Sequence, residues 1–147
     1  MATPGEARIV QADGRSKVYR PLPRDARAAA LRQGFADYAA GDPFEAHEAW
    51  EPAWMGTDDL AERALVQGLI KVAAADVHGR RGNAAGVVRN LEGALERLEY
   101  ARAAGVDRAP GVAVDLATLI DRASSRLAGA RDGDPGPTID LPWRQDP

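Results

Sequence analysis

The chain has no cysteine among its 147 residues, which excludes disulfides, thiolate zinc sites and cysteine nucleophiles. Aromatic residues make up only 5% of the sequence, and β-branched runs are rare. Together with abundant alanine, this composition favours packed helices over β-sheet. No apolar run is long enough to span a bilayer, and the first residues lack the apolar core of a signal peptide. We therefore expect a soluble, cytoplasmic protein with no membrane attachment.

The charge of the chain is small and negative. The formal net charge is −3 and the pI is about 5.4, which argues against general affinity for nucleic acid or for anionic membranes. A chain of this length fits one domain and can bury a sizeable core.

Capping residues and glycines divide the chain into five expected helices. The strongest start signal is Asp42 followed by Pro43, because an aspartate cap and a proline in the first turn both favour a helix N-terminus. Pro52 should kink the helix that follows. The patterns predict helices over about 24–40, 43–55, 57–78, 83–104 and 112–128.

These elements predict an all-α fold, a compact bundle of about five helices. The second and third helices should form a central hairpin, and the single helical domain should span 24–130. Residues 1–23 should be a loose N-terminal arm with one short strand near 9–10. Residues 131–147 should be an extended tail, whose 141–143 segment could dock on the body. A sheet of three or more strands would contradict this prediction.

The segment 44–54, FEAHEAWEPAW, is the most informative stretch of the chain. On a helix, five of its side chains share an arc about 120° wide, which should face the core: Phe44, His47, Trp50, Glu51 and Trp54. His47 and Glu51 are four residues apart and are neighbours on a helix surface. An ionisable pair inside an aromatic face is costly unless it is paired or used, so we expect a site here.

The third expected helix is apolar over most of its circumference. Its remaining strip carries Gln67, Lys71, Ala74 and His78 at helical spacing. If the second and third helices form a tight antiparallel hairpin, His78 should approach Phe44 and His47. His47 and His78 are the only histidines of the chain.

Two linked runs, FEAHEAWEPAW and QGLIKVAAADVHGRRGNAAG, resemble the bacterial, archaeal and plant family known as domain of unknown function 309. His47, Glu51 and Trp54 match its His-x-x-x-Glu-x-x-aromatic motif. The second run matches its other block at Gln67–Ile70, His78, Gly82 and Asn83. The resemblance covers about residues 25–105 and implies a small all-helical fold and a suspected metal-binding role for the His and Glu. It departs at Lys71, where glutamine is frequent, and at Asp76, where an apolar residue is usual.

Two classes of function remain open. The first is a structural or partner-binding module, in which His47 and Glu51 form a buried hydrogen bond that fixes helix packing. As a variant, a small-molecule pocket of unknown ligand would be lined by Phe44, Trp50, Trp54, Gln67 and Lys71. We also expect a homodimer, since a small helical unit with a wide apolar surface tends to bury it symmetrically.

The second class is a metal-dependent enzyme, most plausibly a hydrolase. His47, Glu51 and His78 would bind one Zn, Fe or Mn ion, because two imidazoles and a carboxylate are a ligand set used by catalytic metals. Glu48, at the edge of the arc, would be a fourth ligand or a general base. A lysine at position 71 would oppose a bound cation. The spacing alone does not decide between these two classes.

Overall fold

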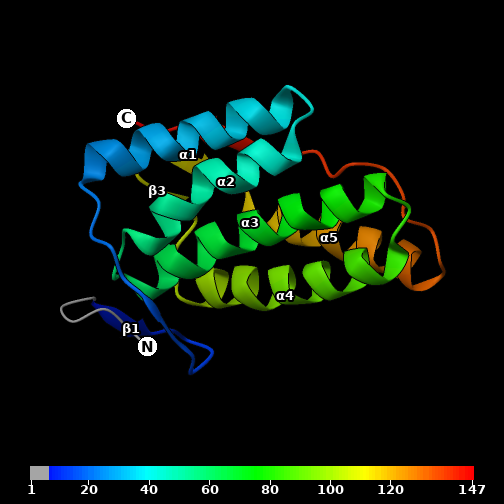
Figure 1. The fold of residues 1–147 in the computed structure, drawn as a ribbon, viewed down its shortest axis with the longest axis horizontal. Coiled ribbons are helices and arrows are strands. Elements are labelled where there is room, and N and C mark those ends of the chain that lie inside the picture. The colour runs from blue at the N-terminus through cyan, green and yellow to red at the C-terminus, as the bar shows by residue number, and fades with distance from the viewer. Residues whose placement is uncertain (1–6) are drawn as a thin grey trace.

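Five helices lie side by side in the computed structural model of the chain, which describes residues 7–147. They are α1 (Arg24–Ala39), α2 (Pro43–Met55), α3 (Leu60–Arg80), α4 (Ala84–Ala103) and α5 (Leu116–Arg131). Figure 1 shows α1 to α4 stacked in chain order, with α5 behind α3 and α4. The all-α bundle is therefore confirmed, and α2 and α3 pack against each other across a short connection, as expected for the hairpin.

Side-chain caps set most of the helix starts where the sequence predicts them. Asp42, Asp59 and Asn83 each accept a hydrogen bond from the backbone N–H three residues on, over 3.1, 2.9 and 3.0 Å. Glycines in the left-handed conformation follow α1 and α3, with φ of +86° at Gly41 and +69° at Gly82. The predicted boundaries of the first four helices are confirmed to within a few residues.

The start of the fifth helix was predicted wrongly. Residues 112–114 form strand β4 (Val112–Val114), and the helix begins only at Leu116, after Asp115 accepts from the N–H of Thr118 over 3.1 Å. The physical reason is that Val112 and Val114 are β-branched and fully buried in a turn-and-strand segment that begins at Gly111, where φ is +79°.

Two small sheets complete the described part of the chain. In the N-terminal arm, β1 (Arg8–Val10) pairs antiparallel with β2 (Ser16–Val18), so the strand expected near 9–10 is confirmed. The expectation of a loose arm was wrong for the described residues, because Gln11 and Val18 of this hairpin are hydrogen-bonded to Arg63 of α3. Residues 1–6 of the expected arm lie outside the described residues. The second sheet has three strands in the order β3 (Arg108–Ala109), β4 and β5 (Trp143–Gln145). A sheet of three strands was named above as contradicting the all-α prediction, and that criterion was too strict. The strands have only two or three residues each, so the fold stays predominantly helical.

Trp50 is the centre of the aromatic core. It is 0% exposed, and its Nε1 donates to the Leu31 carbonyl over 3.0 Å. A side chain at Gly34 would overlap the Trp50 indole, so this glycine lets α1 and α2 approach. Phe35 packs edge-on against Trp50 at 5.2 Å and stacks on Trp143 at 4.3 Å. The 141–143 segment of the tail therefore docks on the body, as the sequence predicted.

The middle helix of the bundle is α3, which packs against α2 on one side and α4 on the other. Its buried side chains cover most of its circumference, and the strip of Gln67, Lys71, Ala74 and His78 stays partly exposed. Within residues 7–147, no helix has the length and apolar character needed to cross a membrane.

Candidate functional site

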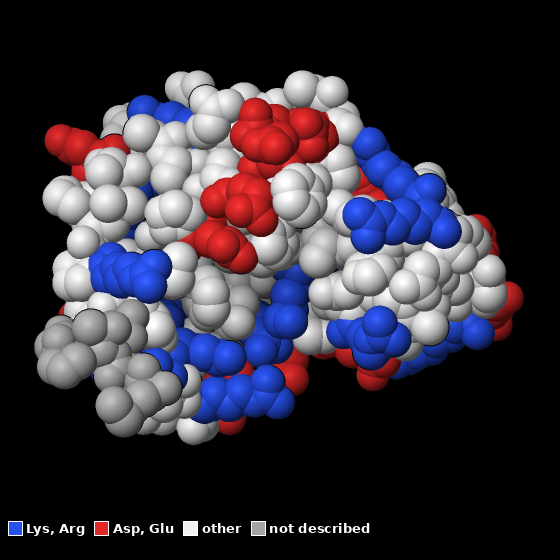
Figure 2. Space-filling view, viewed as in Figure 1, with Lys and Arg blue, Asp and Glu red and all other residues white. Residues whose placement is uncertain are grey.

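The core-facing side of α2 differs from the predicted arc. The buried stripe runs through Ala46, Trp50 and Ala53, whereas the side chain of Phe44 is 54% exposed. The small alanines and Gly34 let the neighbouring helices come close on that side, which turns the motif's polar residues toward the surface. An acidic band therefore follows α2 in Figure 2. The prediction that the whole arc faces the core was wrong.

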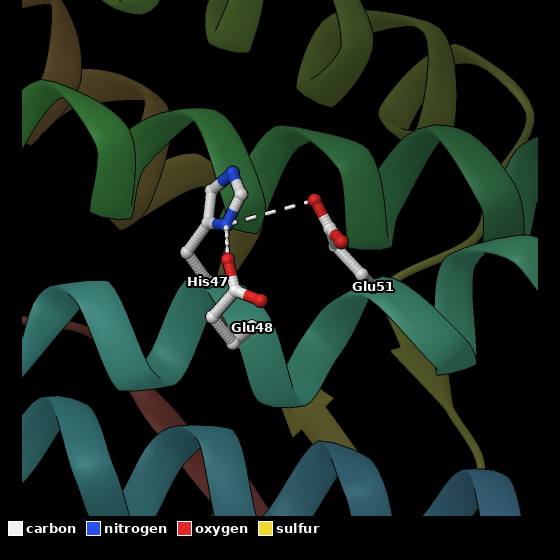
Figure 3. Close-up of side chains that lie close together, drawn as sticks. All are labelled: His47, Glu48 and Glu51. Atoms are coloured by element: carbon white, nitrogen blue, oxygen red, sulfur yellow. Dashed lines mark ion pairs between the residues drawn. The ribbon is translucent and has the colours of Figure 1, made fainter.

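His47, Glu48 and Glu51 come together at the edge of this helix. His47 Nδ1 lies 3.4 Å from a carboxylate oxygen of Glu48 and 3.7 Å from one of Glu51. One ligand atom from each residue lies within 4.8 Å of the other two. Figure 3 shows His47 and Glu51 reaching from α2 toward α3. The side chains of His47 and Glu51 are 27% and 38% exposed. The Nδ1 atom of His47 is nevertheless enclosed and makes no hydrogen bond within the described part of the chain.

These separations fit a metal ion. Zinc binds imidazole nitrogen and carboxylate oxygen at about 2.1 Å, so two ligand atoms at tetrahedral positions are roughly 3.4 Å apart. The two distances from His47 Nδ1, 3.4 and 3.7 Å, are close to that value. One nitrogen and two oxygen donors from this group would leave at least one coordination position for water or a ligand.

The structure does not bring His78 into this group. Its Nδ1 lies 3.1 Å from the side-chain amide of Asn83, in the turn between α3 and α4. The reason is the difference in helix length, since α3 has 21 residues and α2 has 13. Arg80 donates to the carbonyl of Gly41, which precedes α2, so the last turn of α3 extends past the start of α2. His78 lies there and not opposite His47.

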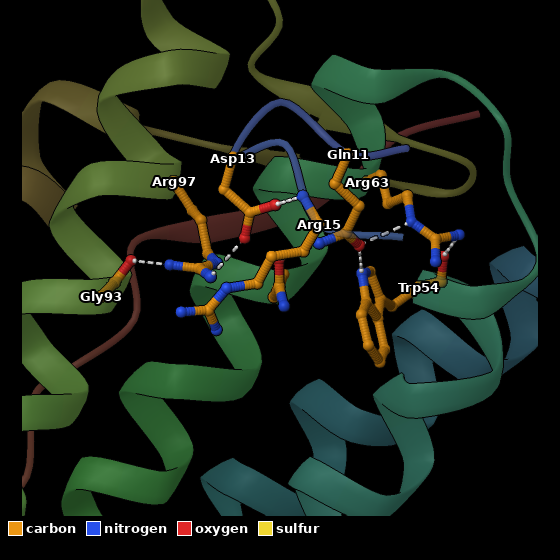
Figure 4. Close-up of polar contacts among 8 residues, drawn as sticks. Gln11, Asp13, Arg15, Trp54, Arg63, Gly93 and Arg97 are labelled. Carbon is orange, nitrogen blue, oxygen red and sulfur yellow. Dashed lines mark hydrogen bonds and ion pairs between the residues drawn. The ribbon is translucent and has the colours of Figure 1, made fainter. Parts of the chain in front are cut away.

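A buried arginine next to this site was missed by the sequence analysis. Arg63 is 1% exposed, and its Nε donates to Gln11 Oε1 over 2.8 Å. Gln11 Oε1 also accepts from Trp54 Nε1 over 3.0 Å, and the Arg63 guanidinium lies 5.1 Å from the centre of the Trp54 ring (Figure 4). Gln11 in turn donates to Gln67 over 3.4 Å. Trp54 and Gln67, both predicted pocket residues, are therefore joined by a residue of the N-terminal hairpin.

The partners of Arg63 are neutral acceptors. Besides Gln11, its guanidinium donates to the carbonyls of Val18, Trp54 and Thr57 over 2.9, 3.1 and 3.1 Å. Burial lowers the pKa of Arg63. The signal available in the sequence was an arginine inside the apolar arc of the third helix, whereas nothing local marked Gln11 as its partner.

The remaining predicted pocket residues do not share one cavity. Phe44 is exposed, Trp50 is enclosed in the core, and Lys71 is half-buried against α4. Gln67 lines a cavity of about 100 Å³ beneath the β1–β2 hairpin. A larger cavity, about 720 Å³, lies elsewhere, beside β4, β5 and the start of α5, and none of the predicted site residues lines it.

Residues 31–90 match the family model described as "Domain of unknown function (DUF309)". This match supports the DUF309 family for that segment of the chain. The matched segment contains all of α2 and α3, and so includes His47, Glu48 and Glu51. No curated protein and no solved structure matched the chain. The family description assigns no function, so the function is argued from the site.

Proposed function

We propose that this DUF309 protein is a metal-dependent binding module. His47, Glu48 and Glu51 hold one divalent ion at the surface of α2, and the open positions of the ion receive a ligand or partner. The observation that carries the proposal is the enclosed Nδ1 of His47. It has no hydrogen-bond partner among residues 7–147 and lies 3.4 and 3.7 Å from two carboxylate oxygens, at the separations of atoms that share an ion.

A purely architectural pair has less support. At 3.7 Å the contact between His47 and Glu51 is too long for a hydrogen bond, and both side chains are partly exposed. Exposed ion pairs of this kind contribute only about 0–1 kcal/mol to stability. Helix packing around Trp50 therefore does not depend on the pair.

A hydrolase has less support as well. A bound ion would act as a Lewis acid or lower the pKa of a bound water. Glu48, the candidate general base, lies among the three possible ligands, and that group contains no fourth His, Asp or Glu. With Glu48 used as a ligand, the group retains no base. Imidazole together with carboxylate suits Zn, Fe or Mn.

Metal content and thermal melting test the proposal together. The purified protein should contain nearly one equivalent of Zn, Fe or Mn by elemental analysis. A chelator should lower the melting temperature and added ion should restore it, because an ion present at about 100 times its Kd stabilises the native state by about 2.7 kcal/mol. His47→Gln, Glu48→Gln and Glu51→Gln should each abolish the response to the ion.

Two matched variants serve as controls. Glu45→Gln removes an exposed carboxylate from the same helix, and His78→Gln removes the other imidazole of the chain. Both should keep the metal content and the chelator response of the wild type. A metal-free protein whose melting temperature ignores chelator and added ions would refute the proposal.

A further inference from the structure

Two basic side chains contact Gly93 of α4, Lys71 from α3 and Arg97 from α4 itself. Figure 4 shows the Arg15 side chain, from the turn of the N-terminal hairpin, beside Arg97, and the charge of Arg15 also lowers the pKa of Lys71. Figure 2 shows basic side chains over α4 toward the hairpin, below the acidic band of α2. This gathering occurs in a chain whose net charge is −3, so general basicity does not explain it.

Gly93 provides the space that Lys71 occupies. A Cβ at position 93 would lie 2.9 Å from Cδ, 3.2 Å from Cε and 3.4 Å from Nζ of Lys71. The lysine stem therefore crosses the α4 backbone at a position without a side chain, and a methyl group there would displace it. Within residues 7–147, no carboxylate forms an ion pair with Lys71.

Arg97 is held beside the same glycine. Its Nη1 donates to the Gly93 carbonyl over 3.0 Å, and its Nη2 donates to Asp13 over 3.2 Å, as Figure 4 shows. The side chain is only 13% exposed, and its Nε is enclosed with no hydrogen-bond partner among residues 7–147. The guanidinium is thus oriented in advance, and its Nε donor stays unused.

The local charges are not balanced by the protein. Burial lowers the pKa of Lys71, and the charges of Arg97, Arg15 and Lys17 lower it further, against one opposing carboxylate, Glu96. The carboxylate of Asp13 already has two partners, because it accepts from Arg97 Nη2 and from the backbone N–H of Arg15 over 2.9 Å. Grouping cations in a half-buried position costs free energy unless an anion joins them.

We propose that Arg15, Lys71 and Arg97 form a binding site for the phosphate group of a small ligand. A dianionic phosphate gains from several cations at once, and arginine and lysine are the side chains that usually bind it. The site is built from residues outside the His47–Glu48–Glu51 group. It therefore stands whether or not a metal ion binds there.

Calorimetric titration with inorganic phosphate, at constant ionic strength and in the presence of a chelator, tests this site separately from the metal site. The wild type should bind phosphate saturably, and phosphate should raise its melting temperature. Lys71→Met removes the ammonium group and keeps the stem over Gly93, so affinity should fall about tenfold or more. The melting temperature without phosphate should rise, because an unbalanced charge is gone.

Gly93→Ala provides a second variant that removes no charge. Its new methyl group would displace the Lys71 stem, so it should also weaken phosphate binding while the protein stays folded. Arg89→Gln is the matched control, an exposed arginine of the same helix, and should bind phosphate as the wild type does. Absence of saturable binding would overturn the proposal. So would an equal loss in Arg89→Gln, or acetate binding as tightly as phosphate.

Discussion

Arg63→Met should separate the N-terminal hairpin from the helical body. Arg63 joins three parts of the chain, since it donates to Gln11 and Val18 of the hairpin, to the last turn of α2 at Trp54, and to Thr57. Methionine keeps most of the apolar volume against the Trp54 ring but offers no donor. The substitution therefore tests the hydrogen bonds rather than the packing.

The magnitude follows from two opposing effects. The carbonyls of Val18, Trp54 and Thr57 each lose a donor, and a buried acceptor left without one costs about 1–3 kcal/mol. Against this, a buried guanidinium without a carboxylate partner pays a desolvation cost of several kcal/mol, which the substitution removes. Three such carbonyls cost about 3–9 kcal/mol, and the regained desolvation offsets several kcal/mol of this, so we expect a net loss of about 1–4 kcal/mol in the free energy of unfolding.

Urea unfolding and hydrogen exchange measure the two consequences. The midpoint of urea unfolding should fall. The backbone amides of β1 and β2 should lose more protection from hydrogen exchange than those of α4, because the hairpin loses its hydrogen bonds from Arg63 to Gln11 and Val18. Arg89→Met, an exposed arginine, should change stability by no more than about 0.5 kcal/mol. A loss below about 1 kcal/mol for Arg63→Met, with hairpin protection unchanged, would show that these hydrogen bonds do not hold the arm.

Three further outcomes are expected. Trp50→Ala should lower the free energy of unfolding in urea by about 3–5 kcal/mol, and Trp54→Ala should lower it by less, because Trp50 is enclosed and Trp54 is partly exposed. A larger loss for Trp54→Ala than for Trp50→Ala would contradict this. Burial lowers the pKa of Lys71 below 10.5, so the folded state releases this proton before the unfolded chain does. The free energy of unfolding of the wild type, measured against that of Lys71→Met, should therefore rise with pH between the pKa of folded Lys71 and pH 10.5. A difference that does not change with pH would mean that the Lys71 ammonium is fully solvated. Sedimentation at micromolar concentration should show a homodimer, and a 15.6 kDa species alone would exclude it.

Local signals in the sequence were enough for the helices and for one group of site residues. The caps Asp42, Asp59 and Asn83 depend only on local sequence, because each side chain accepts a hydrogen bond from the backbone N–H three residues further on. His47 and Glu51 were expected to be neighbours because one helical turn separates them. Glu48 joins them because its carboxylate turns back along the same helix, 3.4 Å from His47.

Which face of α2 is buried was decided only by tertiary packing. The periodicity of 44–54 allowed the aromatic arc to face inward, but Gly34, Ala46 and Ala53 let the neighbouring helices approach on another side. The place of His78 depended likewise on the relative lengths of α2 and α3. No pattern within either helix contains that information.

The sequence by itself determined the helical elements, their caps and the grouping of His47 with Glu51, because each depends on residues within one or two helical turns. Only the tertiary structure decided that Gln11 would meet Arg63, and that Lys71 and Arg97 would meet at Gly93. These residues are tens of positions apart in the chain. Their contacts depend on how the hairpin docks and on how α3 and α4 are aligned, which is settled by burial of the whole core.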